Sequence, residues 1–293
     1  MHSLESSVTA VNNAIENCKY LSTTGLLEEM AIDAGKYALS AGGKRIRPVL
    51  CMEFYKLFGG DEDISDIAIA LEIMHTFSLI HDDLPEMDND DYRRGKPSTH
   101  IKYGVGTALL AGDGLCLLPF EIISDSAISG KISFETATCL SNLLSKASGN
   151  RGMILGQMLD TEYGDEEITL ERLIRTSRYK TGCLLEVSCK FGAVLAGCDN
   201  KDIESAGEYG RNLGLAFQII DDILDVTSSQ ELLGKPIGSD KDNGKTTYVD
   251  ILGLEKAKEL AKEYTKNAVN CIRNYNNSKL LCELAERILN RVN

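Results

Sequence analysis

The sequence predicts an all-α protein that folds as a single helical bundle. Proline occurs at only five positions in 293 residues, and between the prolines apolar residues recur at steps of three and four. The alternation of apolar and polar residues that is typical of strands is missing. No long glycine- or proline-rich linker divides the sequence, so we predict one domain over residues 1–293.

The candidate helices follow these apolar repeats. They cover residues 4–20, 26–41, 48–58, 64–84, 104–128, 132–148, 168–197, 201–229, 250–274 and 278–291. Gly59-Gly60 and Ser129-Gly130 are typical of short turns between helices, and Pro48 is expected at the first position of its helix. The longest apolar region, 105–123, is interrupted by two acidic residues, so we predict a buried helix there and not a membrane span.

The composition is that of a globular intracellular protein. Lys and Arg total 31 against 44 Asp and Glu, a formal charge of −13, and such an acidic surface repels the phosphate backbone of a nucleic acid. The nine cysteines include no pair at the two-residue spacing of metal or redox motifs. Residues 1–20 lack the continuous apolar stretch of a signal peptide, so we expect a cytoplasmic location.

Two acidic clusters each end an apolar helix. The first runs from Asp82 to Asp88 around Pro85. Because proline disfavours helix at the residue before it, the helix should end near Leu84. In an unbroken helix Asp82 and Asp88 would point about 120° apart, and the break lets Asp88 fold back toward Asp82.

The second cluster, 221–225, is regular, with Asp221 and Asp225 on one helical face. Neighbouring carboxylates repel each other unless cations lie between them. All-oxygen ligation suits Mg²⁺, which takes its remaining ligands from water and substrate phosphates. A single acidic cluster is also compatible with a solvated helix end, which is how we interpret Asp61-Glu62-Asp63.

Basic residues lie near both clusters in sequence. Gly42-Gly43 leads into Lys44, Arg45 and Arg47, a turn that suits a diphosphate. The other basic segments are Arg93-Arg94-Gly95-Lys96, Lys180-Thr181, Gly234-Lys235 and Gly244-Lys245. His75, seven residues before Asp82, is expected to face the same cavity, with a core histidine as the alternative. Each segment alone is compatible with surface charge, but together they predict an anion site.

These motifs resemble those of the trans-isoprenyl diphosphate synthases, and most closely the bacterial farnesyl diphosphate synthase branch. The matching segments, which span nearly the whole chain, are Gly42–Pro48, Leu79–Asp88, Arg93–Pro97, Gly156-Gln157, Lys180-Thr181, Gln218–Asp225 and Gly234–Pro236. Ser98 and Gly114 stand where the family commonly has threonine and alanine. The resemblance implies an all-α bundle around a deep central cavity, usually a homodimer. It also implies a head-to-tail condensation, in which isopentenyl diphosphate attacks the cation formed from an allylic diphosphate.

The resemblance further implies the residue roles. Three Mg²⁺ ions, with Mn²⁺ as a substitute, would be held by Asp82, Asp88 and Asp221, supported by Asp83, Asp222 and Asp225. Arg93, Lys180 and Lys235 resemble the groups that bind the allylic diphosphate, and Lys44, Arg47, His75 and Arg94 resemble the isopentenyl diphosphate pocket. Thr181 and Gln218 are expected to offer oxygen dipoles to the carbocation, and Gly43, Phe217 and Lys245 are further substrate-binding candidates.

Phe77, five residues before Asp82, is expected to close the floor of the hydrocarbon tunnel, because the next residue, Ser78, is too small to stop a chain. Packing into the core is compatible with that role. In the family an aromatic residue here accompanies a farnesyl product, so we expect (2E,6E)-farnesyl diphosphate from isopentenyl and dimethylallyl or geranyl diphosphate. A geranylgeranyl diphosphate synthase with the same chemistry is the alternative.

Three other readings remain open. An HD-type metal phosphohydrolase would use the His81-Asp82 pair flanked by His75 and His100, but it leaves the second acidic cluster unexplained. A non-catalytic synthase subunit would be expected to lose one cluster. A class I terpene cyclase would carry Asn, Ser or Thr, and Glu ligands in its second metal motif, where Asp222 and Asp225 stand.

Overall fold

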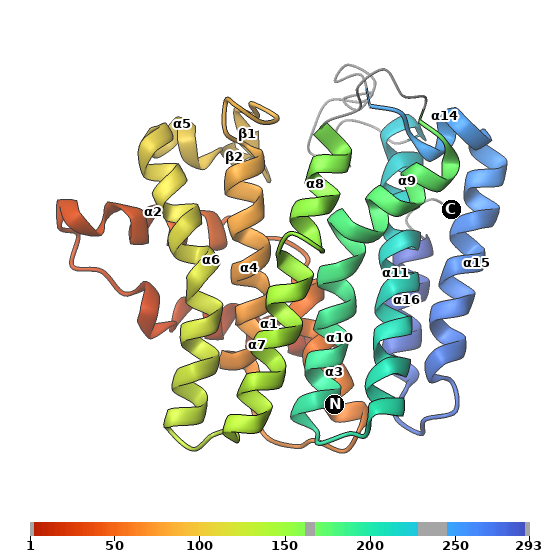
Figure 1. Ribbon diagram of the computed structural model, residues 1–293, viewed down its shortest axis with the longest axis horizontal. Helices are drawn as coiled ribbons and strands as arrows, with labels where there is room; N and C mark the ends of the chain where they lie inside the picture. Colours follow the sequence, from red (N-terminus) through yellow and green to blue (C-terminus); the bar gives the residue numbers. More distant parts are fainter. Residues whose placement is uncertain (1–2, 162–167, 228–244, 291–293) are drawn as a thin grey trace. The chain divides into compact units, whose positions relative to one another are not determined.

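The computed structural model describes residues 3–161, 168–227 and 245–290, and helices make up most of them (Figure 1). In chain order the helices are α1 (Leu4–Glu16), the 3-10 turns η1 (Lys19–Leu21) and η2 (Leu27–Glu29), α2 (Met30–Leu39), α3 (Ile46–Leu57), α4 (Ser65–Asp82), α5 (Thr99–Tyr103), α6 (Val105–Ile128), α7 (Phe134–Ser148), α8 (Met153–Thr161), α9 (Leu170–Ser177), the π-helical segment η3 (Arg178–Gly182), α10 (Cys183–Leu195), α11 (Asn200–Thr227), α14 (Tyr248–Leu252), α15 (Leu254–Ile272) and α16 (Lys279–Leu289). The predicted all-α class is confirmed.

The chain divides into two compact units. The first comprises Met1–Met52 and Glu62–Ser141, and the second comprises Glu53–Asp61 and Asn142–Asn293. Two of the three unit boundaries therefore fall inside helices α3 and α7, and the third lies between α3 and α4. The first acidic cluster belongs to the first unit, and the second cluster belongs to the second.

Helix α4 is the core helix of the first unit. It packs along α6 and also contacts α1 and α2 (Figure 1). Every residue from Ile67 to Met74 is buried, so the helix is covered on all its faces in this stretch. Because such a helix has little solvent-exposed surface, its position is well determined by packing, and so is the acidic segment at its end.

Helix α11 has the same place in the second unit, where it packs against α10 and α15 (Figure 1). The fully buried Tyr209 lies on this helix and donates its hydroxyl to the carbonyl of Leu281 at 2.8 Å. Its ring also contacts Phe54 edge-on, with 5.2 Å between centroids. The apolar packing of α11 therefore holds Asp221–Asp225 at its carboxyl-terminal end.

Several boundaries differ from the sequence predictions. Helix α3 begins at Ile46, so Pro48 is its third residue and not its first. This is tolerated because the first-turn N–H groups of a helix have no partner within it. The predicted helix 104–128 agrees with α6, but the short helix α5 before it was not predicted, and Gly104, with φ of 85°, separates the two. Helix α8 was not predicted, because its nine residues follow the helix-breaking glycines of 149–152.

A short hairpin was also missed. Strands β1 (Tyr92–Arg93) and β2 (Lys96–Pro97) pair antiparallel. The two residues between them, Arg94 and Gly95, have φ of 54° and 75°, as a type I′ turn requires. Two-residue strands are too short to produce a visible alternation in the sequence, so this element could not be recognised from periodicity.

Among the described helices, α6 is long and apolar enough to cross a membrane on length and composition alone, and 44% of its most apolar window is buried inside the structure. It packs against α4 and α2. This agrees with the predicted core helix.

Candidate active site

The first aspartate cluster lies where α4 ends. The helix stops at Asp82, three residues before Pro85. The backbone N–H of Asp88 donates to the carbonyl of Asp82 at 2.9 Å, and Asn89 continues the turn with φ of 51°. The chain therefore folds Asp88 back onto the helix end, as predicted from the proline. Both Asp82 and Asp88 are half-buried.

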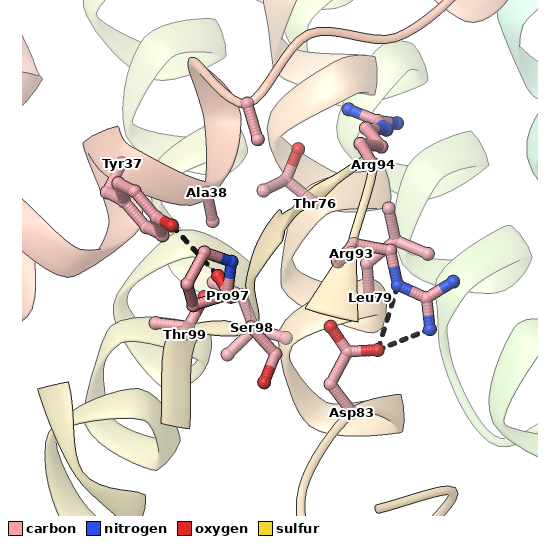
Figure 2. A pocket seen from close by; sticks show the side chains of 12 residues that line it. Tyr37, Ala38, Thr76, Leu79, Asp83, Arg93, Arg94, Pro97, Ser98 and Thr99 are labelled. Carbon is pink, nitrogen blue, oxygen red and sulfur yellow. Dashed lines mark hydrogen bonds and ion pairs between the residues drawn. The ribbon is translucent and has the colours of Figure 1, made fainter. Parts of the chain in front are cut away.

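Asp83 is buried and holds Arg93 of the hairpin. Its Oδ1 accepts from Nε of Arg93 at 2.9 Å and also from a terminal guanidinium nitrogen (Figure 2). The same guanidinium contacts Asp90 Oδ2 at 2.8 Å. Burial raises the pKa of Asp83, and Arg93 opposes that rise. The ion pair fixes Arg93 beside the end of α4, whereas Arg94 points away from Asp83 in Figure 2.

The turn at 42–47 presents cations next to a buried carboxylate. Gly43 has φ of 126°, a backbone conformation that requires glycine, and a Cβ there would displace the guanidinium end of Arg94, 2.6 Å away. Lys44 is exposed. The Nε of Arg47 is buried and makes no hydrogen bond. Burial lowers the pKa of Arg47 to about 10, while Glu72 opposes the shift and Arg94 adds to it.

His75 lies half-buried on α4 among these cations. Burial, together with the positive charges of Arg47, Arg94, Arg93 and Arg45, holds its pKa well below 6.5. The imidazole is therefore neutral at physiological pH and offers one N–H donor without adding charge.

Phe77 and Ser78 are both half-buried on the last turns of α4. The Phe77 ring packs edge-on against His81, with 5.1 Å between centroids. His81 Nε2 lies 3.1 Å from the carbonyl of Leu109 on α6. Ser78 Oγ donates to the carbonyl of His75 at 2.9 Å. The aromatic ring is thus held in place by its neighbours within the first unit.

In the second unit, the central aspartate of the α11 cluster is committed to protein donors. Asp222 Oδ1 accepts from Gln218 Nε2, and its Oδ2 accepts from the backbone N–H of Tyr248, both at 3.0 Å. Asp221 is half-buried and Asp225 is buried on the same helix. Asp222 therefore orients Gln218 and anchors the start of α14.

Two of the predicted basic residues meet at one carboxylate. Asp160 Oδ2 on α8 lies 2.5 Å from Nζ of Lys180 and 3.3 Å from Nζ of Lys245. Burial raises the pKa of Asp160, but the two lysines outweigh this and the pKa lies below its usual value. The two ammonium groups thus share one anion site. Lys235 lies outside the described residues.

Lys180 and Thr181 belong to the π-helical segment η3. Helices of this type are rare in proteins, and those that occur are often found at functional sites. Thr181 Oγ1 donates to Gln218 Oε1 at 3.2 Å. Phe217, beside Gln218, is half-buried. These groups form part of a pocket within the second unit, whose lining includes Asp160, Leu173, Thr176, Ser177, Lys180, Thr181, Gln218, Asp222, Lys245, Thr246 and Thr247.

Within the described part of the chain, no three or more His, Cys, Asp or Glu side chains form a group that could hold a metal ion. The first cluster brings the backbones of Asp82 and Asp88 together, and Asp221 and Asp225 share a helical face. Each pair offers only carboxylate oxygens, the ligand type that Mg²⁺ takes, and leaves the remaining coordination positions to water or substrate.

Sequence reasoning missed three residues that organise these sites: Glu72, Asp160 and Tyr248. A signal for Glu72 was present, because a carboxylate inside an otherwise apolar helix is unusual unless it is paired. The partners of the other two lie 20 and 26 residues away in sequence, so no short-range pattern reveals them.

Comparison with known proteins agrees with this arrangement of motifs. The family model described as polyprenyl synthetase matches residues 28–286. A farnesyl diphosphate synthase of Micrococcus luteus is 46% identical over 232 residues, 79% of this chain and 78% of the relative. A chloroplastic geranylgeranyl pyrophosphate synthase of Capsicum annuum is 42% identical over 288 residues, 97% of this chain and 76% of the relative.

Solved structures show the same fold. The apo structure of an FPP/GFPP synthase from Zymomonas mobilis has a TM-score of 0.85 at 31% identity, covering 98% of this chain and 97% of that one. A Helicobacter pylori geranyltransferase, complexed with magnesium and isoprenyl diphosphate, has a TM-score of 0.84 at 32% identity, covering 99% of this chain and 96% of that one.

The chain belongs to the polyprenyl synthetase family. It is a prenyltransferase with trans-prenyl diphosphate synthase activity, and this membership excludes the phosphohydrolase reading. The relatives include both farnesyl and geranylgeranyl synthases, so the family alone leaves the product length open.

Proposed function

We propose that this chain is a Mg²⁺-dependent farnesyl diphosphate synthase. It condenses isopentenyl diphosphate head to tail with dimethylallyl diphosphate, and then with geranyl diphosphate, to give (2E,6E)-farnesyl diphosphate and diphosphate. Two observations carry the proposal, within a chain of this family. Arg93 pairs with Asp83 of the first aspartate cluster. Lys180 and Lys245 meet at Asp160, in a pocket whose lining includes Asp222 of the second cluster.

Isopentenyl diphosphate binds at the turn that carries Gly43, Lys44 and Arg47, together with His75 and Arg94. The buried Nε of Arg47, which makes no hydrogen bond, supports this assignment. An unsatisfied buried guanidinium nitrogen is costly, and a diphosphate oxygen would satisfy it. His75, held neutral by its surroundings, donates an N–H without adding to the repulsion among the arginines.

The allylic diphosphate binds Arg93, Lys180, Lys235 and Lys245. The contact of Lys180 and Lys245 with a single carboxylate oxygen supports this, because it places two ammonium groups where one anion can meet both. The all-oxygen donors fit Mg²⁺, with Asp82, Asp88 and Asp221 as ligands and Asp83 and Asp225 in support. When bound, three Mg²⁺ ions, or Mn²⁺ in their place, would neutralise the charge that grows on the departing diphosphate.

The residues beside the reacting carbons stabilise positive charge and exclude water. Thr181 and Gln218 present oxygen dipoles, and Phe217 adds an aromatic surface beside them. Asp222 keeps Gln218 oriented through the bond from its side-chain nitrogen. The diphosphate that has left accepts the proton lost after condensation, so the protein supplies no base.

Farnesyl diphosphate is the proposed product because Phe77 closes the tunnel below the first aspartate cluster. The T-shaped contact with His81 supports a fixed floor, since it restrains the ring. A geranylgeranyl diphosphate synthase with the same chemistry remains the alternative. We propose that both units act as one catalytic domain in a cytoplasmic homodimer that binds no nucleic acid.

The metal assignment is tested by Asp82→Ala and Asp221→Ala, with Asp61→Ala as the matched control at an exposed aspartate near the start of α4. Each site variant should lower turnover by about 10²-fold or more, because each removes charge stabilisation that acts on the departing diphosphate. The control should stay near the parent rate. Near-normal turnover in both site variants, with unchanged circular dichroism, would remove the metal-site assignment.

A further inference from the structure

Glu72 lies on the buried side of α4, three residues before His75, and only 1% of the residue is exposed. Its Oε1 contacts the guanidinium of Arg45 at 2.9 Å, and 4% of Arg45 is exposed. The other Arg45 donors reach Asn12 Oδ1 at 3.0 Å and the carbonyl of Leu39 at 2.8 Å. Arg45 is therefore committed to protein acceptors and does not serve as a substrate ligand.

The same carboxylate also faces Arg94. Glu72 Oε1 lies 3.9 Å from a terminal nitrogen of Arg94, and the other terminal nitrogen donates to the carbonyl of Gly42. Arg45 and Arg94 both have positive φ, 52° and 54°, which is uncommon for residues other than glycine. Two such residues around one carboxylate indicate a local backbone held in place by its side-chain contacts.

Charge gives Glu72 a second effect. Burial lowers the pKa of both Arg47 and Arg94, and neighbouring arginines add to the shift, Arg94 acting on Arg47 and Arg45 and Arg93 acting on Arg94. Glu72 opposes both shifts and so favours the charged forms of Arg47 and Arg94. A buried ion pair contributes little net stability compared with well-packed apolar residues, so stability alone does not explain its presence. Its specific effect here is to hold several like charges close together in a fixed arrangement.

We infer that Glu72 is a positioning residue for the isopentenyl diphosphate site. Through Arg45 it fixes the 42–47 turn, and through Arg94 it fixes the turn of the 92–97 hairpin, so that Arg47 and Arg94 meet one diphosphate in a set geometry. Glu72 itself touches no substrate. The inference rests on the proposed function, because it takes Arg47 and Arg94 to be ligands of isopentenyl diphosphate.

The test is steady-state kinetics of Glu72→Gln, which keeps the shape of the side chain and removes its charge. The KM for isopentenyl diphosphate should rise about tenfold, the scale of one charge-assisted contact, while kcat and the KM for geranyl diphosphate stay within about twofold. Glu72→Asp, which keeps the charge, should lie closer to the parent. The matched control is Glu53→Gln, at another buried glutamate whose nearby cation is Lys56, and it should leave both KM values unchanged.

Arg47→Ala separates this inference from the proposed function. If Arg47→Ala raises the KM for isopentenyl diphosphate and Glu72→Gln does not, the positioning role is wrong and the pocket stands. If Arg47→Ala has no effect on that KM, the pocket assignment itself fails.

If Glu72→Gln does not fold, Arg45→Lys takes its place. Lysine keeps the positive charge but cannot make the guanidinium hydrogen bonds to Asn12 and Leu39. An equal rise in the KM values for isopentenyl and geranyl diphosphate in that variant would also overturn the inference.

Discussion

Single side chains in both units owe their positions to partners of opposite charge or to aromatic contacts. Arg93 is fixed by Asp83, and Lys180 is fixed by Asp160. The identity of the substrate-binding candidates could be predicted from the sequence, because glycine-led basic turns and paired aspartates are local patterns. The carboxylates that hold them could not, because Glu72 and Asp160 meet cations 20 or more residues away. Long-range ion pairs depend on packing, which a local pattern does not encode.

Phe77→Ala tests the product length at the scale of one residue. Removal of the ring leaves a cavity that the surroundings refill only in part, so the tunnel should admit at least one more isoprene unit. The main product should shift to geranylgeranyl diphosphate or longer. Chromatography of the dephosphorylated products measures this. If farnesol remains the only product, another residue closes the tunnel.

The helices themselves were largely predictable, and the exceptions have physical reasons. Long apolar repeats located α4 and α11 to within a few residues, because a buried helix has to be apolar over many turns. The run 168–197 was predicted as one helix, but within it Arg178–Gly182 is π-helical. Periodicity could not reveal a five-residue segment of this kind. The segment packs against α8, where Gly156 approaches the backbone of Lys180, and this long-range contact is not visible in the local sequence.

That approach gives a prediction for the element. A Cβ at Gly156 would lie 2.0 Å from the backbone nitrogen of Lys180, so Gly156→Ala has to displace either α8 or η3. We expect a loss of about 1–3 kcal/mol in the free energy of unfolding and a higher KM for the allylic substrate. Urea denaturation and steady-state kinetics measure the two effects. Gly182→Ala is the control, because its new Cβ meets nothing closer than 3.6 Å. Equal effects of the two variants would show that the close approach has no special importance.

At the scale of the whole molecule, a formal charge of −13 means that the proposed diphosphate substrates need either local clusters of basic residues or a divalent metal ion to bind. The arginines at 45, 47, 93 and 94 all belong to the first unit, and their charges all act on His75 of α4. The lysines at 180 and 245 belong to the second unit. The composition indicated this division between acidic surface and basic sites, although not which carboxylates would hold the cations.

The proposed homodimer is tested on α6, which exposes Val105, Leu109, Leu110, Leu117 and Ile128 within the described residues. A second copy of this helix face would cover these side chains. Leu117, 70% exposed near the middle of the helix, is the site for Leu117→Asp. Light scattering should give twice the mass of one chain for the parent and the mass of one chain for Leu117→Asp. Leu27→Asp, at another exposed leucine, is the control and should give the same mass as the parent. A monomeric parent at micromolar concentration would contradict the proposal.

The most direct measurement is a product assay with isopentenyl and geranyl diphosphate, with and without Mg²⁺. With Mg²⁺, we predict release of diphosphate in step with the formation of farnesyl diphosphate, detected as farnesol after phosphatase treatment. Chelation with EDTA should abolish both signals, because the carboxylates alone cannot neutralise the charge on the departing diphosphate. A folded protein that consumes no isopentenyl diphosphate with Mg²⁺, or that keeps full activity in EDTA, would contradict the proposed reaction.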